Sequence, residues 1–395
     1  MKNIISDSDI RARAAGMTPT KKVNTDALQA AVDARQQQRD AQKNNNNKPS
    51  ESKQEDGEDE AQDAEEEEEE RPVATLSSCV DLDAIEDDEL YYVGTAGVKV
   101  THLDALEKLV GLQRLHVRSN LLRSMASVAT LTRLEHLELY DNQIEAIEGL
   151  QSLVQLKVLD LSFNEIRVIP DLSHLTQLEE LYVANNKLKK ISGVQSLKNL
   201  KKLDLGANRL RTIEGLDGLS QLEQLWLGKN KITAIQGLEK LTKLKIISVQ
   251  SNRVVTIKGL ENNVALEELY LSHNAIEKIE NVDDLTNLTT IDLAGNRISA
   301  IPTGLAPLTL LEDFWLNDNQ VAHFADVEHL VPLGGLRTLY LERNPIAQDF
   351  EYRKRVEELL PELDQIDATP TTKARRGRIL NFKQVQLLCS NLQVS

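Results

Sequence analysis

The sequence predicts an α/β repeat solenoid: a curved stack of about 11 to 12 repeats with a parallel sheet on the concave face. Two observations predict this fold class. Asparagines recur at fixed steps of 22 residues over most of the chain, and the same spacing of leucine and isoleucine surrounds each of them. A fixed period of this length is typical of short repeats that bury a shared core by stacking on one another.

The asparagine register defines the repeats. Eight successive steps of 22 residues are followed by steps of 23 and 25, and the frame around each asparagine reads LxxLxLxxNxIxxIxxLxxL. This frame is the leucine-rich-repeat signature. We expect a structural ladder formed by Asn120, Asn142, Asn164, Asn186, Asn208, Asn230, Asn252, Asn274, Asn296, Asn319 and Asn344.

Each part of the frame has a physical reason. Leu225 and Leu227 alternate with outward residues, as a short parallel strand requires. After the asparagine, apolar residues come every three positions, which favours short 3₁₀ or irregular turns on the convex face. The asparagine side chain can bond backbone groups that would otherwise be buried without a partner. A ladder that binds a ligand is the alternative.

The composition divides the chain into four parts. Residues 1–75 are predicted to be a disordered arm, in which residues 51–70 hold 13 acidic side chains and one lysine. The arm is either a solvating tail or an acidic segment that competes for a basic surface of a partner. Residues 76–344 form the predicted solenoid, residues 345–369 a helical C-terminal cap, and residues 370–395 a basic and apolar tail.

The net charge of −16 argues against a nucleic-acid partner, because nucleic-acid binding depends on neutralising phosphates. Two widely separated cysteines and a start without an apolar run predict a reduced, intracellular protein. The sequence holds no run of about 20 apolar residues that could span a membrane. The basic cluster at residues 373–378 is either a nuclear-localisation signal or part of a solvated tail.

One outward column of the predicted sheet is unexpectedly aromatic. Four residues before each asparagine, 11 positions hold five of the 14 aromatic residues of the chain, separated by carboxylates. We expect these rings to remain exposed to water unless a partner covers them. Exposed aromatic rings in a row are typical of a protein-binding strip. The alternative is that the rings pack against their strand neighbours. The predicted strip consists of Asp160, Tyr182, Asp204, Trp226, Tyr270, Asp292, Trp315 and Tyr340, with Asp313 beside it.

The same residues do not predict catalysis. The carboxylates of the open face lack a pocket, a nucleophile and a glycine-rich phosphate loop. His323 and His329 come nearest to a metal-ligand spacing, and we predict no metal site there. The sequence therefore predicts a protein that is not an enzyme and needs no cofactor.

With the repeats aligned, the chain resembles the leucine-rich-repeat regulatory subunits of type-1 serine/threonine protein phosphatase, the protein phosphatase 1 regulatory subunit 7 family. The segments LELYDNQIEAIEGL, LDLSFNEIR, LWLGKNKIT, LYLSHNAIE, FWLNDN and YLERNP, with the closing QIDAT, carry this resemblance over roughly residues 78–369. It implies that the phosphatase is bound by Asp160, Tyr182, Asp204, Trp226, Asp292, Asp313, Trp315 and Tyr340. At Tyr182 and Trp226 the family has phenylalanine, and at Asp204 and Asp313 it has glutamate.

The resemblance implies a non-catalytic subunit that influences the maturation, storage or mitotic activity of the phosphatase catalytic subunit in the nucleus and cytoplasm. Any metals would belong to that partner. A phosphatase inhibitor in a ternary complex is also implied, and the chain on its own is expected to be monomeric. The alternative function is a nuclear or ribonucleoprotein leucine-rich-repeat scaffold with a different protein partner.

Overall fold

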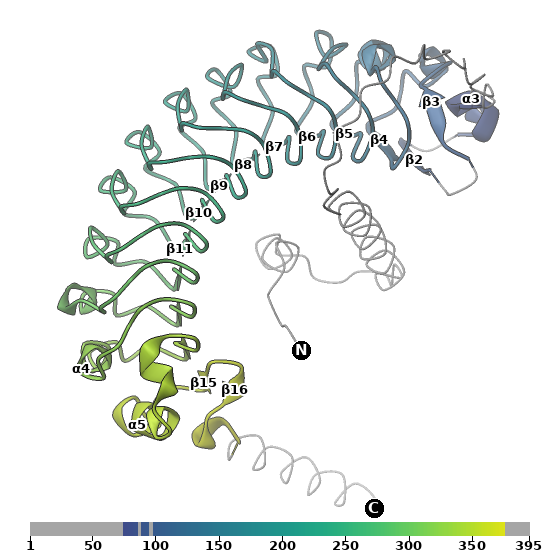
Figure 1. Cartoon of the computed structure of the whole chain (residues 1–395). Helices are drawn as coiled ribbons and strands as arrows, with labels where there is room; N and C mark the ends of the chain where they lie inside the picture. Colours follow the sequence, from purple (N-terminus) through teal and green to yellow (C-terminus); the bar gives the residue numbers. More distant parts are fainter. Residues whose placement is uncertain (1–73, 86–87, 95–97, 376–395) are drawn as a thin grey trace, which may run out of the picture. The chain divides into compact units, whose positions relative to one another are not determined.

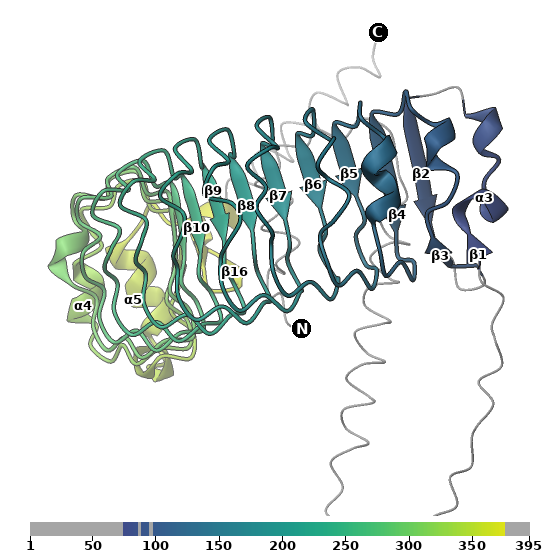
Figure 2. The same cartoon turned by 90° about the horizontal axis from the view of Figure 1, so that it is seen from above.

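The computed structural model describes residues 74–85, 88–94 and 98–375. These residues form one continuous stack of coils, in which the strands line the inner side of the curve and short turns line the outer side (Figure 1). Seen from above, the strands lie side by side along the stack (Figure 2). Residues 1–73 of the predicted arm and residues 376–395 of the predicted tail lie outside the described residues. The last two residues assigned to the arm, Ala74 and Thr75, form a short strand instead.

The inner side is a single 14-stranded sheet with the order β16-β15-β14-β13-β12-β11-β10-β9-β8-β7-β6-β5-β4-β2. All neighbours are parallel except the last pair, β15 and β16. Each strand from β5 to β14 has three residues and repeats the register of the one before it. The strands are β2 Glu89–Val93, β4 Arg114–Arg118, β5 His136–Glu138, β6 Val158–Asp160, β7 Glu180–Tyr182, β8 Lys202–Asp204, β9 Gln224–Trp226, β10 Ile246–Ser248, β11 Glu268–Tyr270, β12 Thr290–Asp292, β13 Asp313–Trp315, β14 Thr338–Tyr340, β15 Gln365–Ile366 and β16 Thr369–Pro370.

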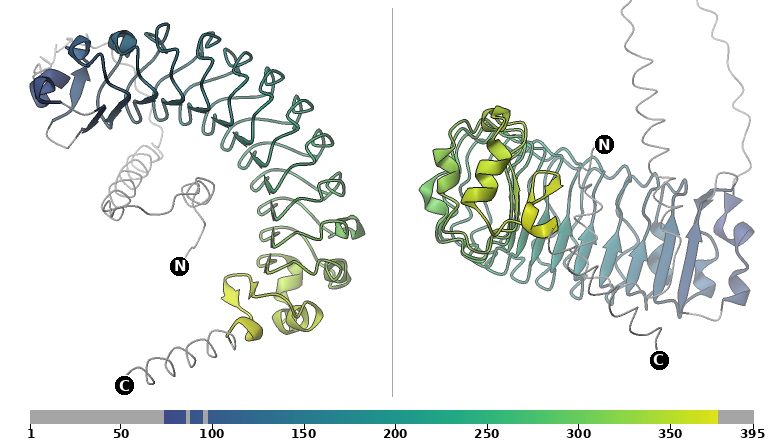
Figure 3. Two further views of the ribbon diagram at one scale, coloured as in Figure 1. Left: turned by 180° about the vertical axis from the view of Figure 1, so that it is seen from behind. Right: turned by 90° about the horizontal axis from the view of Figure 1, so that it is seen from below.

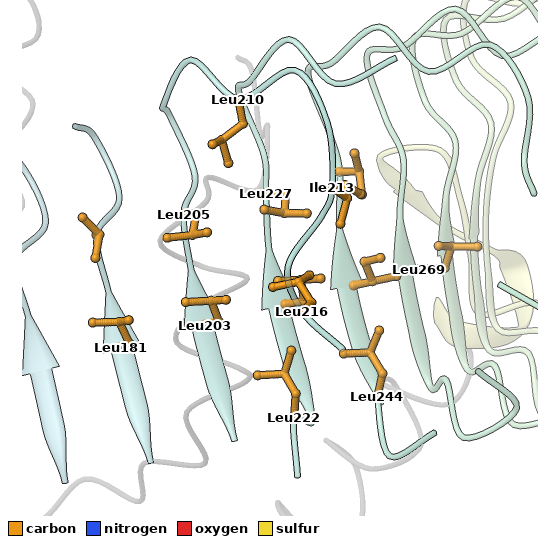
Figure 4. Close-up of a cluster of buried hydrophobic side chains, with 14 of the residues drawn as sticks. Leu181, Leu203, Leu205, Leu210, Ile213, Leu216, Leu222, Leu227, Leu244 and Leu269 are labelled. Atoms are coloured by element: carbon orange, nitrogen blue, oxygen red, sulfur yellow. The ribbon is translucent and has the colours of Figure 1, made fainter. Parts of the chain in front are cut away.

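The core runs the length of the stack as parallel rows of leucine and isoleucine. In one coil, Leu203 and Leu205 of the strand segment and Leu210 of the following turn are fully buried. The equivalent residues of neighbouring coils lie next to them, as Figure 4 shows for the central repeats. The predicted inward positions Leu225 and Leu227 are both buried. Because each coil covers its neighbours, the apolar rows become a core only when the coils stack.

The predicted asparagine ladder is confirmed. In a typical rung, Asn208 donates through Nδ2 to the carbonyl oxygens of Val183 at 2.9 Å and Leu205 at 3.0 Å. Its Oδ1 accepts from the backbone N–H of Leu188 at 2.9 Å. The side chain thus binds its own coil and the preceding one, and each asparagine from Asn142 to Asn344 repeats this pattern. The residue before the asparagine is left-handed in every repeat, which permits the tight turn.

The convex side consists mainly of irregular turns, as the three-residue spacing predicts. Four short 3₁₀ helices and a single-turn helix interrupt these turns, and the last two of these elements lie in the repeats with steps of 23 and 25 residues. They are η1 Leu82–Ala84, η2 Leu106–Lys108, η3 Ala126–Thr130, η4 Thr303–Leu305 and α4 Ala325–Glu328. Among the described residues, no helix is long and apolar enough to cross a membrane.

Atypical elements close both ends of the stack (Figure 3). At the N-terminal end, β1 (Ala74–Thr75) pairs with β3 (Val100–His102), and α3 (Leu76–Cys79) places its leucine in the core. At the C-terminal end, η5 (Pro345–Gln348) and the amphipathic helix α5 (Tyr352–Leu359) cover the last coil together with β15 and β16. These elements keep the terminal core residues away from water.

Candidate partner-binding site on the concave face

The sheet register places the predicted strip in one line. Neighbouring strands pair Asp160 with Tyr182, Tyr182 with Asp204, and Asp204 with Trp226. Farther along, Ser248 lies between Trp226 and Tyr270. Beyond Tyr270 the line continues through three more residues. These are Asp292, Trp315 and Tyr340. Asp313 lies in the neighbouring column, opposite Thr290 and Thr338.

The four C-terminal rings of this line form a continuous aromatic ladder. The centroids of Trp226 and Tyr270 are 6.2 Å apart in a stacked arrangement. Tyr270 and Trp315 are 6.5 Å apart and tilted, and Trp315 meets Tyr340 edge to face at 6.3 Å. Such contacts stabilise the orientation of each ring. The ladder is therefore a preorganised surface rather than a set of independent side chains.

The expectation that these rings stay exposed to water is wrong for Trp226 and Tyr270, the two N-terminal rings of the ladder. Trp226 is 5% exposed and Tyr270 is 6% exposed, whereas Trp315 and Tyr340 are partly buried. The physical reason is that the ring of Tyr270 has an aromatic neighbour on each side, and its hydroxyl donates a 2.7 Å hydrogen bond to Glu268. The alternative interpretation, packing against strand neighbours, is correct for these two rings.

The strip also contains buried polar atoms without a hydrogen-bond partner. Within the described residues they include Nε1 of Trp226, Nε1 of Trp315, and Oγ of Ser248. Buried polar groups in folded proteins are nearly always paired, so each such atom requires an explanation. All three lie in the same column, and two belong to paired positions on β9 and β10. The centre of the strip therefore has hydrogen-bonding capacity that the described fold does not use.

Three carboxylates of the strip fold back onto the backbone. Oδ1 of Asp160 accepts from the N–H of Ser162 at 2.8 Å, and Asp204 and Asp292 accept in the same way from the residue two positions later, at 2.9 and 3.0 Å. Burial nevertheless raises the pKa of Asp160 to about 6, outweighing the hydrogen bond to Ser162. Burial likewise raises the pKa of Asp292 to about 6. Ionising either carboxylate in the folded chain therefore costs free energy, and a cation close by would remove that cost.

Tyrosine hydroxyls at the two ends of the strip are tied to neighbouring side chains. Tyr182 donates to Glu180 of the same strand, and the ammonium group of Lys202 lies 5.1 Å from the centre of its ring. Burial, followed by the hydrogen bond to Glu180, raises the pKa of the Tyr182 hydroxyl. At the other end, Tyr340 accepts a 2.6 Å hydrogen bond from Nε2 of Gln365. These contacts hold both rings in place.

The structure adds one residue that sequence reasoning missed. Tyr91 on β2 pairs with His116 of β4, so it continues the same column beyond the first asparagine. Tyr91 is 55% exposed; its ring centroid is 5.8 Å from that of His116 and 5.7 Å from the guanidinium carbon of Arg118. The first coil lacks the asparagine, which hid its register. Aligning Leu90 with Leu115 would have found it.

The described residues contain no group of three or more His, Cys, Asp or Glu side chains placed to hold a metal ion. Nδ1 of His329 lies 2.6 Å from the carbonyl oxygen of Ile301, so a backbone contact accounts for this histidine. The arrangement offers an elongated face with carboxylates and packed rings, which is suited to binding a folded partner.

The comparisons with known proteins agree with this geometry. A family model for leucine-rich repeats in two copies matches residues 132–176, 154–196, 176–218 and 220–262, and a second leucine-rich-repeat model matches residues 262–387. The chain belongs to the leucine-rich-repeat family. An internalin from Listeria monocytogenes has a TM-score of 0.57 at 25% identity and covers 72% of this chain and 87% of its own. A leucine-rich-repeat protein from Leptospira interrogans has a TM-score of 0.57 at 26% identity, covering 68% of this chain and 75% of its own.

Curated relatives match over a short stretch. Protein phosphatase 1 regulatory subunit pprA of Dictyostelium discoideum is 43% identical over 66 residues, which is 17% of this chain and 19% of the relative. Protein phosphatase 1 regulatory subunit 7 of Xenopus tropicalis is 47% identical over 49 residues, or 12% of this chain and 14% of the relative. The human protein of the same name is 46% identical over 46 residues, or 12% of this chain and 13% of the relative. The matches thus span less than a fifth of these relatives, and they support the resemblance to leucine-rich-repeat regulatory subunits of this phosphatase.

Proposed function

We propose that this protein is a non-catalytic regulatory subunit that binds the catalytic subunit of type-1 serine/threonine protein phosphatase through the concave strip. The names of the relatives support the class of partner. The observation that carries the proposal for the site is the aromatic ladder flanked by carboxylates, because folding of the repeats does not require either at these positions. Ser248, in the same column, shows that a small polar residue is tolerated there.

The charge pattern of the strip fits a partner with a basic surface. Asp160 and Asp204 lie on the N-terminal side of the ladder, and Asp292 and Asp313 lie within its C-terminal half. Burial raises the pKa of Asp160 and Asp292, so a lysine or arginine placed beside either one would stabilise its ionised form. The rings would supply apolar contact area between two acidic positions.

The length of the strip fits a folded domain. From Asp160 on β6 to Tyr340 on β14 there are eight strand spacings of about 4.8 Å, which gives roughly 38 Å. Because the rings already pack against one another, binding would cost little side-chain entropy. A rigid strip of this size can anchor a folded domain without rearranging.

In this proposal the chain supplies no chemistry and the catalytic metals belong to the phosphatase. Binding would influence the maturation, storage or mitotic activity of the catalytic subunit, in the nucleus and cytoplasm. A phosphatase inhibitor bound to the same catalytic subunit would complete a ternary complex. These finer roles rest on the family resemblance, whereas the binding surface rests on the residues described above.

The test is capture of purified type-1 catalytic subunit by the full-length chain. We expect the wild type to retain the phosphatase and the double variant Tyr182→Ala/Trp315→Ala to lose it. The matched control is Tyr140→Ala/Phe163→Ala, which removes an aromatic pair 4.9 Å apart that lies outside the strip. Circular dichroism first establishes that all three proteins are folded. If the strip variant and the control retain equal amounts, the strip is not the binding site; if the wild type retains none, the partner is wrong.

A further inference from the structure

A second surface of the central repeats has a charge opposite to that of the whole chain. Residues 185–260 hold 15 lysines and arginines against five aspartates and glutamates, a net charge of +10 in a chain whose total is −16. Much of this positive charge lies just after the asparagines, on the edge where the chain leaves each strand. We call this surface the basic ridge and define it as Arg167, Lys189, Arg209, Arg211, Lys231 and Arg253, all of which are exposed.

The backbone stacks the ridge residues on adjacent coils. The N–H of Arg209 donates to the carbonyl oxygen of Leu188 in the preceding coil at 2.8 Å. The N–H groups of Lys231 and Arg253 donate in the same way, also at 2.8 Å, each to the coil before it. Their positive charges therefore lie on successive rungs about 4.8 Å apart. Like charges on directly neighbouring strands are destabilising, so the fold gains nothing from this arrangement.

The opposite edge of the same coils shows how the chain avoids such repulsion. Seven residues before the asparagines, acidic and basic residues alternate from coil to coil. Lys157 pairs with Glu135 at 2.8 Å, and two further pairs follow at the same position. These are Lys201 with Glu179 at 2.7 Å and Lys245 with Glu223 at 3.1 Å. This edge neutralises itself, and its charges are accounted for by ion pairs within the stack.

The ridge is not neutralised in this way. Its N-terminal neighbour Lys187 pairs with Glu165, but among the described residues Arg209, Lys231 and Arg253 form no ion pair and no side-chain hydrogen bond. Other repeats carry uncharged residues at the same position, among them Gln143, Ala275 and Gln320, and one carries Glu165; a further cation, Arg297, lies outside the run. The position therefore does not require a cation, and a run of three unpaired cations calls for a function other than folding.

We infer that the basic ridge binds an acidic, extended polypeptide segment of a partner protein. The five coils that carry the ridge span about 19 Å, which an extended chain of about six residues covers, with carboxylates on one face meeting successive rungs. Arginine-rich clusters bind such acidic segments through charge-assisted hydrogen bonds. A nucleic acid is the less suitable occupant, because the remainder of the chain carries a net charge of −26 that repels a long polyanion.

The test measures fluorescence anisotropy of a labelled twelve-residue peptide of alternating Glu and Gly with the full-length chain at 50 mM salt. We expect the wild type to bind it and the variant Arg209→Gln/Lys231→Gln/Arg253→Gln to bind at least tenfold more weakly. The matched control, Lys198→Gln/Lys240→Gln/Lys258→Gln, removes the same charge from exposed positions outside the ridge and should stay within twofold of the wild type. A peptide of alternating Gln and Gly should not bind.

Three results would overturn the inference: no binding of the acidic peptide by the wild type, equal losses in the ridge variant and the control, or tenfold tighter binding of a twelve-nucleotide single strand that the ridge variant abolishes. The last result would make the ridge a nucleic-acid site. Because Trp315→Ala leaves the ridge intact, it should bind the peptide like the wild type. Peptide binding by this variant therefore tests the ridge independently of phosphatase binding at the concave strip.

Discussion

Two adjacent parts of the concave column, one ending on β5 and the other beginning on β6, hold their carboxylates differently. On β5, Glu138 accepts from Nδ1 of His116 at 2.6 Å and pairs with Arg118. Burial would raise the pKa of Glu138, but the hydrogen bonds from His116 and Arg118 outweigh it and lower that pKa. On the next strand, Asp160 has a backbone N–H in place of such partners, and its pKa is raised to about 6.

The two parts differ in how their carboxylates are paired, not in how many donors they leave unused. In the N-terminal part, from Tyr91 to Glu138, the carboxylate of Glu138 is paired with His116 and Arg118, although Nε2 of His116 and Nε of Arg118 lack a hydrogen-bond partner. The strip from Asp160 to Tyr340 contains packed rings, unpartnered indole nitrogens and carboxylates kept ionised at a cost. A surface whose carboxylates have raised pKa values has more to gain from a cationic partner than one whose carboxylate is already paired.

The largest expected effect is on binding. Trp315→Ala should weaken binding of the phosphatase catalytic subunit by about 2–4 kcal/mol, because truncating a central aromatic anchor removes a hot spot. Tyr91→Ala should change binding by less than about 0.5 kcal/mol, although Tyr91 is the more exposed ring. Isothermal titration calorimetry of both variants measures the contrast. Equal losses in the two variants would extend the binding site over the whole column.

The second effect is on the free energy of unfolding, which should change in opposite directions in these two parts of the column. Arg118→Met should lower the free energy of unfolding by about 1–3 kcal/mol, because it leaves the partly buried Glu138 without its guanidinium partner. Asp160→Asn should raise it by about 1 kcal/mol at pH 7.5, because it removes a partly buried charge and keeps an oxygen for the Ser162 N–H. Urea unfolding measures both. A loss of stability in Asp160→Asn as large as that in Arg118→Met would contradict the contrast.

The third effect is a dependence on pH. The folded-state pKa values of Asp160 and Asp292, about 6, lie above the ordinary value of 3.8, so the folded chain binds extra protons between these values. The stability contribution of these two groups therefore rises as the pH falls from 7 to 4. A cationic partner favours the ionised carboxylates, so binding should weaken about tenfold between pH 7.5 and pH 5. Binding that is unchanged, or tighter, at pH 5 would argue against cations at these two positions.

Most of the fold follows from the sequence because its determinants are local. The asparagine register, the LxL alternation and the three-residue spacing each act within one 22-residue coil, and they place Leu225, Asn208 and the strand column correctly. The burial of Trp226 could not be predicted in the same way. It depends on how a ring on β9 meets a ring on β11, 44 residues later in the chain. The position of Tyr91 was hidden because its coil lacks the asparagine that sets the register.

The pKa shifts of the carboxylates in this column could not be predicted from the sequence either. Glu138 and Asp160 occupy the same column and appear equivalent in the sequence, yet their pKa values shift in opposite directions. The difference arises from the side chains that reach each carboxylate and from burial, both of which are properties of the packed stack. Sequence reasoning therefore finds the column, and the structure divides it into a self-paired part and a part suited to a partner.

The most direct test of the account compares the affinity of the phosphatase catalytic subunit for two double variants of equal charge. Asp160→Asn/Asp292→Asn keeps the shape of the strip and removes its two costly carboxylates, whereas Asp283→Asn/Asp284→Asn removes two exposed ones elsewhere. We predict that the strip variant binds at least a hundredfold more weakly, a loss of about 2.7 kcal/mol, and that the control stays within twofold of the wild type. Equal dissociation constants for the two variants would contradict the claim that these carboxylates are held ready for a partner.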